Sequence, residues 1–201
     1  MKVIGLTGGI GMGKSTAAAA FRRARLPVFD ADFCVHRLQA PGGAALPAIA
    51  RAFPGTVAEQ DGRLALDRGA LRRCVLADPA ALRRLEAILH PMVRRAERAF
   101  LARARRAGAP AAVLDIPLLF ESGGVGRVDR VVVVSAPGAV QRHRVRMRGR
   151  MSAAQIAAVI ARQMPDADKR RRADLVVRTG LSRHHALRTL RRFILSLRDR
   201  K

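Results

Sequence analysis

Residues 8–15 read G-G-I-G-M-G-K-S and match the pattern G-x-x-x-x-G-K-[ST]. The apolar residues 3–6 before this stretch predict a buried parallel strand, and residues 16–21 after it predict a helix. A loop of this kind brings backbone N–H groups and the positive end of a helix dipole to phosphate oxygens. We therefore expect a phosphate-binding loop between a strand and a helix.

The residue types in this loop have separate tasks. Glycines allow positive φ angles and leave no Cβ to obstruct a phosphate. Lys14 is expected to reach the β- and γ-phosphates as a point charge, and the Ser15 hydroxyl is expected to ligate Mg²⁺. The alternative is a glycine-rich surface turn with a chance Lys-Ser pair, but the flanking strand and helix favour the phosphate loop.

The composition is that of a soluble globular protein, with 49% hydrophobic and 27% charged residues among 201. The chain has no run of eighteen apolar residues, so no membrane span is expected. No targeting segment is expected either. Cys34 and Cys74 have neither the spacing of a metal site nor that of a disulfide framework, so reduced thiols in a cytoplasm are expected.

The formal net charge is +24, and arginine supplies almost all of the excess. A basic surface steers polyanionic substrates and binds nucleic acid non-specifically. Because the chain has no Trp or Tyr, platforms for base stacking are scarce, and no specific nucleic-acid partner is expected.

Residues 26–29 predict a second strand, which ends in Asp30-Ala31-Asp32. Ligands of open parallel sheets lie at the carboxyl ends of the strands. Asp32 is therefore a candidate for the base that orients an attacking hydroxyl. One carboxylate of the pair can instead cap the helix that begins near Phe33.

Residues 35–108 indicate helices broken by turns, an insert typical of an acceptor-binding subdomain. Asp78 followed by Pro79 predicts a helix N-cap, and Pro91 predicts a kink within that helix. His90 either contacts a substrate phosphate or satisfies the kinked backbone.

Three further apolar segments, residues 111–115, 128–134 and 174–177, complete five predicted parallel strands. Asp115 ends one strand, where it could contact a water on Mg²⁺. The apolar side chains at 118–120 either pack on the core or line an acceptor pocket.

An arginine-rich arm is predicted between the last two strands. Arg144 and Arg148 are four residues apart, which suits two guanidinium groups on one helix face aimed at the same phosphates. Ser152 and Gln155 match a capping box, so residues 149–152 would be the bend of a mobile lid.

Together these segments predict an α/β fold: a P-loop NTPase core with a five-stranded parallel sheet flanked by helices, a helical insert domain and a helical lid. The reading favours a kinase for a small phosphorylated acceptor. A nucleoside or nucleotide kinase, or a basic ATP-dependent nucleic-acid-binding protein, are the alternatives.

The chain resembles the dephospho-CoA kinase family over nearly its whole length. The motifs that carry the resemblance are residues 5–16, 30–32, 90–91 and 117–121, Gln141-x-x-Arg144-x-x-x-Arg148, and residues 162–174. There are two departures: Met12 stands where the family usually has Ser, and residues 178–180 read Arg-Thr-Gly in place of Asn-x-Gly.

The resemblance implies transfer of the ATP γ-phosphoryl group to the ribose 3′-hydroxyl of dephospho-coenzyme A, with ATP and Mg²⁺ as cofactors. It implies a core of residues 1–32, 109–138 and 172–201, a CoA-binding domain of 33–108 and a lid of 139–171. We expect a cytoplasmic monomer.

The roles implied by the resemblance are as follows. The catalytic residues are Thr7, Lys14, Asp32 and Arg144. The ATP-binding residues are Gly9, Gly11, Met12, Gly13, Lys14, Ser15, Thr16 and Arg148, with Ser15 on the metal. The acceptor-binding residues are Asp32, His90, Leu118, Phe120 and Glu121.

Overall fold

The structure is a computed structural model that describes residues 1–149 and 151–197. Arg150, which belongs to the predicted lid, and residues 198–201, which end the predicted core, lie outside the description. The chain forms two compact units, Met1–Phe29 with Leu101–Lys201, and Asp30–Phe100. The division into core, insert and lid stays a prediction.

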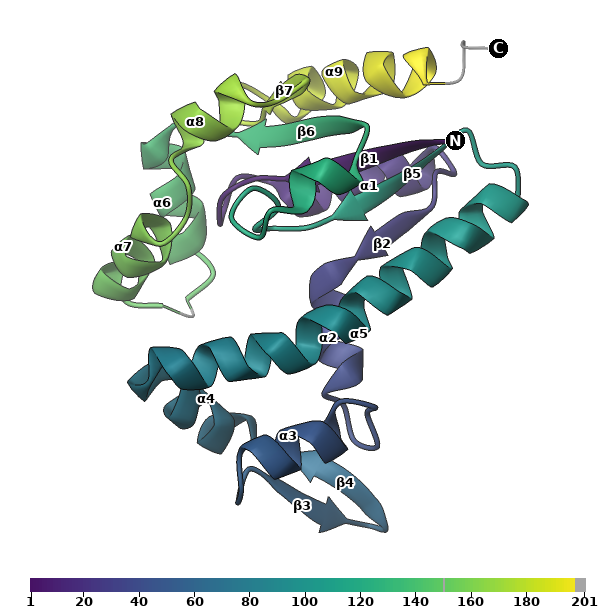
Figure 1. Cartoon of the computed structure of the whole chain (residues 1–201). Coiled ribbons are helices and arrows are strands. Elements are labelled where there is room, and N and C mark those ends of the chain that lie inside the picture. The colour runs from purple at the N-terminus through teal and green to yellow at the C-terminus, as the bar shows by residue number, and fades with distance from the viewer. Residues whose placement is uncertain (150, 198–201) are drawn as a thin grey trace. The chain divides into compact units, whose positions relative to one another are not determined.

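A five-stranded sheet forms the centre of the first unit, in the order β2-β5-β1-β6-β7 (Figure 1). Its strands are β1 (Lys2–Thr7), β2 (Val28–Asp30), β5 (Ala111–Asp115), β6 (Arg130–Ser135) and β7 (Leu175–Arg178). The pairs β1–β5, β1–β6 and β6–β7 are parallel. The five strands expected from the apolar segments are thus confirmed, with β1 in the middle of the sheet.

Two helices cover the core on one side of this sheet. They are α1 (Lys14–Arg23) and α9 (Arg183–Ser196), which contact each other. Phe21 of α1 and Leu190 of α9 are buried in one cluster with Ile4, Leu6 and Val132 of the strands. This apolar packing holds α1, and with it the end of the loop that follows β1.

The remaining elements of the first unit are η1 (Gly124–Arg127), α6 (Gly138–Arg146), α7 (Ala153–Ala161) and α8 (Asp166–Arg171). The predicted capping box at the start of α7 is confirmed. Ser152 Oγ accepts from Gln155 N, and Gln155 Oε1 accepts from Ser152 N. No described helix is long and apolar enough to cross a membrane.

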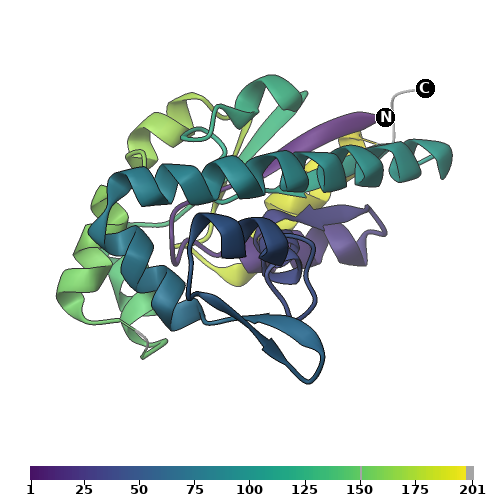
Figure 2. The ribbon, with the colours of Figure 1, turned by 60° about the horizontal axis from the view of Figure 1, so that its bottom comes forward.

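The second unit contains a β-hairpin that the sequence reading missed (Figure 2). The elements are α2 (Ala31–Leu38), α3 (Leu46–Ala52), β3 (Val57–Gln60), β4 (Arg63–Leu66), α4 (Arg68–Ala77) and α5 (Pro79–Arg106), which continues into the first unit. The expectation of helices alone is therefore wrong. Asp61 and Gly62 have φ angles of 49° and 71°, the left-handed conformations that a two-residue hairpin turn requires.

Helix α5 begins as expected and then continues through its proline. Asp78 accepts hydrogen bonds from Ala80 N at 2.7 Å and from Ala81 N at 3.1 Å, so the predicted N-cap is confirmed. Pro91 lies inside the helix. The predicted kink stays a prediction.

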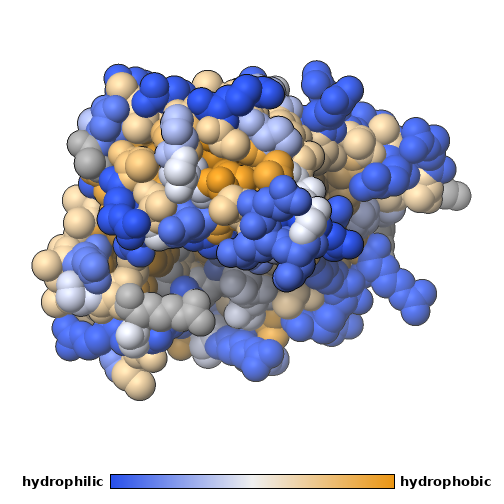
Figure 3. Space-filling view, turned by 90° about the horizontal axis from the view of Figure 1, so that it is seen from below, coloured by the Kyte–Doolittle hydropathy of each residue, from blue (hydrophilic) through white to orange (hydrophobic). Residues whose placement is uncertain are grey.

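Hydrophilic residues cover much of the face shown in Figure 3, where they are drawn in blue. This agrees with the 39 Lys and Arg residues in the chain against 15 Asp and Glu.

Candidate active site

The phosphate loop lies between β1 and α1 and is pressed against its neighbours. A Cβ at Gly8 would stand 2.3 Å from Val134 Cγ2, and a Cβ at Gly11 would stand 2.7 Å from Val145 Cγ2. Gly13 caps α1 with a φ of 94°. Side chains at these positions would collide or be strained, so the glycines bring the loop close to β6 and α6.

Lys14 forms an ion pair at the carboxyl end of the neighbouring strand. Its Nζ lies 2.5 Å from Asp115 Oδ1, and the two side chains are 19% and 4% exposed. Asp115 ends β5, which pairs with β1. Asp115, a candidate for contacting a water molecule on Mg²⁺, thus binds the ammonium group of Lys14.

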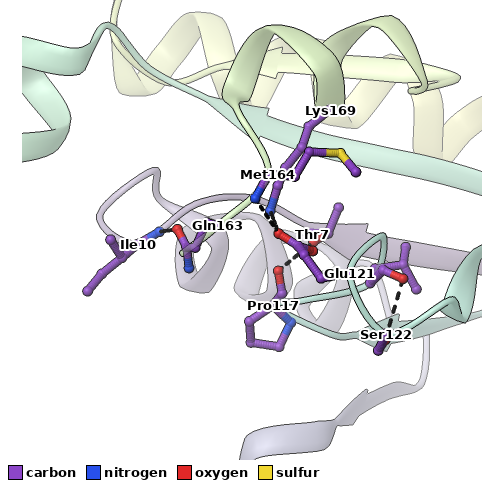
Figure 4. Close-up of polar contacts among 9 residues, drawn as sticks. Thr7, Ile10, Pro117, Glu121, Ser122, Gln163, Met164 and Lys169 are labelled. Atoms are coloured by element: carbon purple, nitrogen blue, oxygen red, sulfur yellow. Dashed lines mark hydrogen bonds and ion pairs between the residues drawn. The ribbon is translucent and has the colours of Figure 1, made fainter. Parts of the chain in front are cut away.

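The two hydroxyls after Lys14 are accessible. Ser15 and Thr16 are exposed in the first turn of α1. Thr7, in contrast, is fully buried at the end of β1, and its hydroxyl donates to the carbonyl oxygen of Pro117 at 2.9 Å (Figure 4). Thr7 therefore joins the strand that leads to the loop with the segment that follows β5.

The apolar segment after β5 divides between core and solvent. Leu119 is fully buried and Phe120 is 9% exposed, whereas Leu118 is 44% exposed. These side chains were expected either to pack on the core or to line an acceptor pocket. Leu119 and Phe120 pack on the core, whereas Leu118 is exposed and accessible to an acceptor.

Glu121 is held by two groups from the arm that follows α7. Its Oε1 accepts from Met164 N at 2.9 Å and lies 2.8 Å from Nζ of the buried Lys169 (Figure 4). Burial raises the pKa of Glu121, but the hydrogen bonds from Lys169 and Met164 and the lysine charge lower it by more, so the pKa lies below its usual value. The carboxylate stays ionised and connects this segment to the arm.

Arg144 makes a bidentate contact with the residue that follows β7. Its Nη1 donates to Thr179 Oγ1 at 3.0 Å and its Nη2 to Thr179 O at 2.8 Å, while Thr179 Oγ1 lies 2.6 Å from Met12 O. Thr179 stands in the segment that departs from the family pattern. Sequence reasoning did not identify it as a partner of Arg144.

A pocket of about 490 Å³ lies beside these contacts. It is lined by the loop residues Gly11, Gly13 and Thr16 and by His143, Arg144, Met147, Arg148, Thr179, Arg183 and Ala186. Helix α6 ends at Arg146 and Met147 keeps helical backbone angles, so the common helix face expected for Arg144 and Arg148 stays a prediction. Both arginines nevertheless line the same pocket.

Met12 is buried, and its Sδ lies 2.9 Å from Ala136 N. The Met12 side chain, which stands where the family usually has Ser, thus packs against the end of β6. Met12 contributes only its backbone to the surface of the phosphate loop.

Two glutamines that had no assigned role contact the tip of the loop. Gln163 Oε1 accepts from Ile10 N at 3.0 Å, and Gln141 Nε2 donates to Ile10 O at 2.9 Å. Both were quoted within motifs, but a sequence motif does not reveal a partner that is 131 or 153 residues away.

The other predicted site residues belong to the second unit. Asp30 caps α2 by accepting from Phe33 N at 2.9 Å, which confirms that one carboxylate of the pair is a cap. Asp32 is exposed in the first turn of α2, and His90 is exposed on α5.

Comparison with known proteins gives one consistent result. A family model described as dephospho-CoA kinase matches residues 2–183. A protein of that name from Gluconobacter oxydans is 52% identical, with 99% of each chain covered, and one from Mesorhizobium japonicum is 57% identical over 90% of this chain and 88% of its own. A crystal structure from Thermus thermophilus is 38% identical and superposes with a TM-score of 0.84 over 97% of this chain and 96% of its own.

Proposed function

The chain belongs to the dephospho-CoA kinase family, and on this premise we propose that it transfers the γ-phosphoryl group of ATP to the ribose 3′-hydroxyl of dephospho-CoA. The observation that carries the proposal is the pocket where Gly11, Gly13 and Thr16 meet Arg144 and Arg148. It combines backbone donors at a helix N-terminus with two guanidinium groups, which suits the phosphates of a nucleotide.

We assign the nucleotide side of the reaction to the loop and its neighbours. Backbone N–H groups of Gly11, Gly13, Lys14 and Ser15 would bind the phosphates, and the Lys14 ammonium group would move from Asp115 to the β- and γ-phosphates. Arg144 and Arg148 would offset the charge of the transferring group. Buried Thr7 would act indirectly, by holding the loop's strand against the segment at Pro117.

Mg²⁺ fits the first turn of α1. Ser15 presents an exposed hydroxyl there, a hard oxygen of the type that Mg²⁺ takes together with phosphate oxygens. When bound, the ion supplies positive charge against the β- and γ-phosphates.

We assign the acceptor side to Asp32, His90 and Leu118. Asp32 would accept the proton of the 3′-hydroxyl and orient its oxygen toward the phosphoryl group. His90 and Leu118 are exposed and would contact the acceptor. Phe120 and Glu121, which are buried or paired, would support the acceptor site through the loop that carries Leu118.

The deciding experiment measures ADP release from Mg-ATP with and without dephospho-CoA, and identifies the product by mass spectrometry. Acceptor-dependent release and a product one phosphate heavier at the 3′ position are expected. Turnover with a nucleoside or nucleotide instead would keep the kinase fold and overturn the acceptor. ATP hydrolysis stimulated by RNA or DNA would point to the nucleic-acid-binding alternative.

We further propose a monomer working in the cytoplasm, and sedimentation of the purified protein tests its mass.

A further inference from the structure

The residue at the tip of the phosphate loop is held on both sides by side chains from the arginine-rich arm. Ile10 N donates to Gln163 Oε1, a contact drawn in Figure 4, and Ile10 O accepts from Gln141 Nε2. Gln141 lies on α6 and is 7% exposed, and Gln163 follows α7. The loop and the arm are therefore joined by two hydrogen bonds of opposite direction.

The direction of each hydrogen bond is dictated by the backbone. An N–H group can only meet an acceptor, and a carbonyl oxygen can only meet a donor, so Gln163 must present its oxygen and Gln141 its nitrogen. These two contacts fix both peptide groups that flank Ile10.

One of these peptide groups determines where a phosphate-binding N–H points. The peptide between Ile10 and Gly11 is planar, so holding the Ile10 carbonyl also holds the Gly11 N–H on the opposite side. Gly11 lines the nucleotide pocket and has a φ of 74°. Met12 N donates to Gly9 O at 3.1 Å and closes a turn around Ile10 and Gly11, but this bond does not involve the peptide group between those two residues. Because glycines at 9 and 11 make rotation of that peptide group inexpensive, the glutamines restrain its orientation.

The arm that carries Gln163 is itself anchored. Met164 N, on the next residue, donates to Glu121, and Lys169 pairs with the same carboxylate. A Cβ on Gly9 would stand 3.1 Å from Gln141 Nε2 and 3.2 Å from Gln163 Oε1. The two side-chain amides thus lie at similar distances from Gly9.

We propose that Gln141 and Gln163 are positioning residues that orient the phosphate loop for nucleotide binding. The proposal rests on the proposed function only in requiring that the loop binds nucleotide phosphates. It does not depend on the identity of the acceptor.

The opposite hydrogen-bond directions provide a matched test. Gln163→Glu keeps an acceptor for Ile10 N, whereas Gln141→Glu removes the only donor that the side chain offers to Ile10 O. Both variants place one negative charge at a similar distance from Gly9, so the two can be compared at equal net charge. Gln60→Glu, on an exposed position of β3, controls for the change in net charge.

The measurement is the dissociation constant of ADP, obtained by calorimetry for the intact protein. We expect Gln141→Glu to bind ADP about 3- to 10-fold more weakly than Gln163→Glu, the change that one lost hydrogen bond produces in an equilibrium constant. The nearly isosteric Gln141→Met and Gln163→Met variants lose one contact each without adding charge, and both should weaken ADP binding by a similar factor.

Equal affinities for the two glutamate variants, or wild-type affinity in both methionine variants, would overturn the proposal. If Gln141→Glu does not fold, the methionine variants decide. A wild-type protein that binds ADP but does not phosphorylate dephospho-CoA would refute the proposed function and leave this comparison intact.

Discussion

Lys14 Nζ and Asp115 Oδ1 lie 2.5 Å apart, and the aspartate side chain is almost completely buried. The pair joins the first residue of α1 to the last residue of β5. The proposal that Lys14 binds the phosphates therefore requires its ammonium group to leave one anionic partner, Asp115, for another.

This pair predicts that stability and nucleotide binding can be separated. Lys14→Met removes the ammonium partner of a buried carboxylate and should lower the free energy of unfolding by about 1–3 kcal/mol. Adding Asp115→Asn removes the buried charge and should recover most of this loss. Urea unfolding of the single and double variants measures the effect. ADP binding should stay impaired in the double variant, and its recovery would show that Lys14 does not bind the phosphates.

Asp32 is expected to carry the proton transfer. Asp32→Asn should lower kcat by roughly 10²- to 10⁴-fold, the usual contribution of a positioned base, with little change in ATP affinity. Asp30→Asn is the matched control, because asparagine also caps helices well and should leave kcat close to that of the wild type. Near-normal turnover of Asp32→Asn would remove this residue from the role.

Thr179 is expected to support both stability and turnover. Thr179→Val keeps the shape of the side chain but removes the hydroxyl between Arg144 Nη1 and Met12 O. The free energy of unfolding should fall by about 1–3 kcal/mol, and kcat should fall because Arg144 is held by one contact instead of two. Thr179→Ser keeps the hydroxyl and should behave as the wild type. Thermal unfolding and steady-state kinetics on the same samples test both effects. The prediction is contradicted if Thr179→Val and Thr179→Ser have the same stability and the same kcat.

Glu121 predicts a loss of stability in acid. Burial raises its pKa in the folded state, but the hydrogen bonds from Lys169 and from Met164 N, together with the Lys169 charge, lower the pKa by more. The stabilisation is therefore complete above the ordinary glutamate pKa of about 4.3 and disappears as the pH falls through the lower, folded-state pKa. Glu121→Gln should flatten the dependence of unfolding free energy on pH in this range. An unchanged slope between wild type and variant would argue against it.

The net charge of +24 predicts steep salt dependence. ATP and dephospho-CoA are polyanions, so electrostatic steering should make kcat/KM fall strongly as ionic strength rises from 0.01 M toward 0.15 M, where the Debye length shortens from about 30 to about 8 Å. A weak dependence would mean that the arginines serve some other purpose than capturing these substrates.

The parts of the fold that repeat a local pattern were predictable. Buried parallel strands are continuous apolar runs, and a phosphate loop requires glycines at defined places, so the sheet and the loop were both correctly expected. The hairpin at Asp61 and Gly62 was missed because its strands have only four residues each and none of these residues is buried, which leaves a weak hydrophobic pattern to recognise. The Asp-Gly pair was the available signal.

Site residues were predictable only where the residue type and its place in a motif indicate the chemical role. Lys14 and Ser15 follow from the loop motif, whereas Gln141, Gln163 and Thr179 acquire roles through partners that are distant in the sequence. The end of α6 at Arg146 was predictable only approximately, and the signal was Gly149, whose φ of 66° is typical of a glycine just beyond the end of a helix.

The central position of β1 has a consequence for biosynthesis. Lys2 pairs with Ala111 and Ile4 with Arg130, so β1 is synthesised before the two strands with which it pairs and must wait for both. Contacts of such long range form slowly, and until then the apolar side chains of this strand have no partners and are open to aggregation or chaperones. The glutamines that hold the loop are translated later still. Strand β1 and the loop after it are thus synthesised before their partners and reach their final contacts only after those partners have been made.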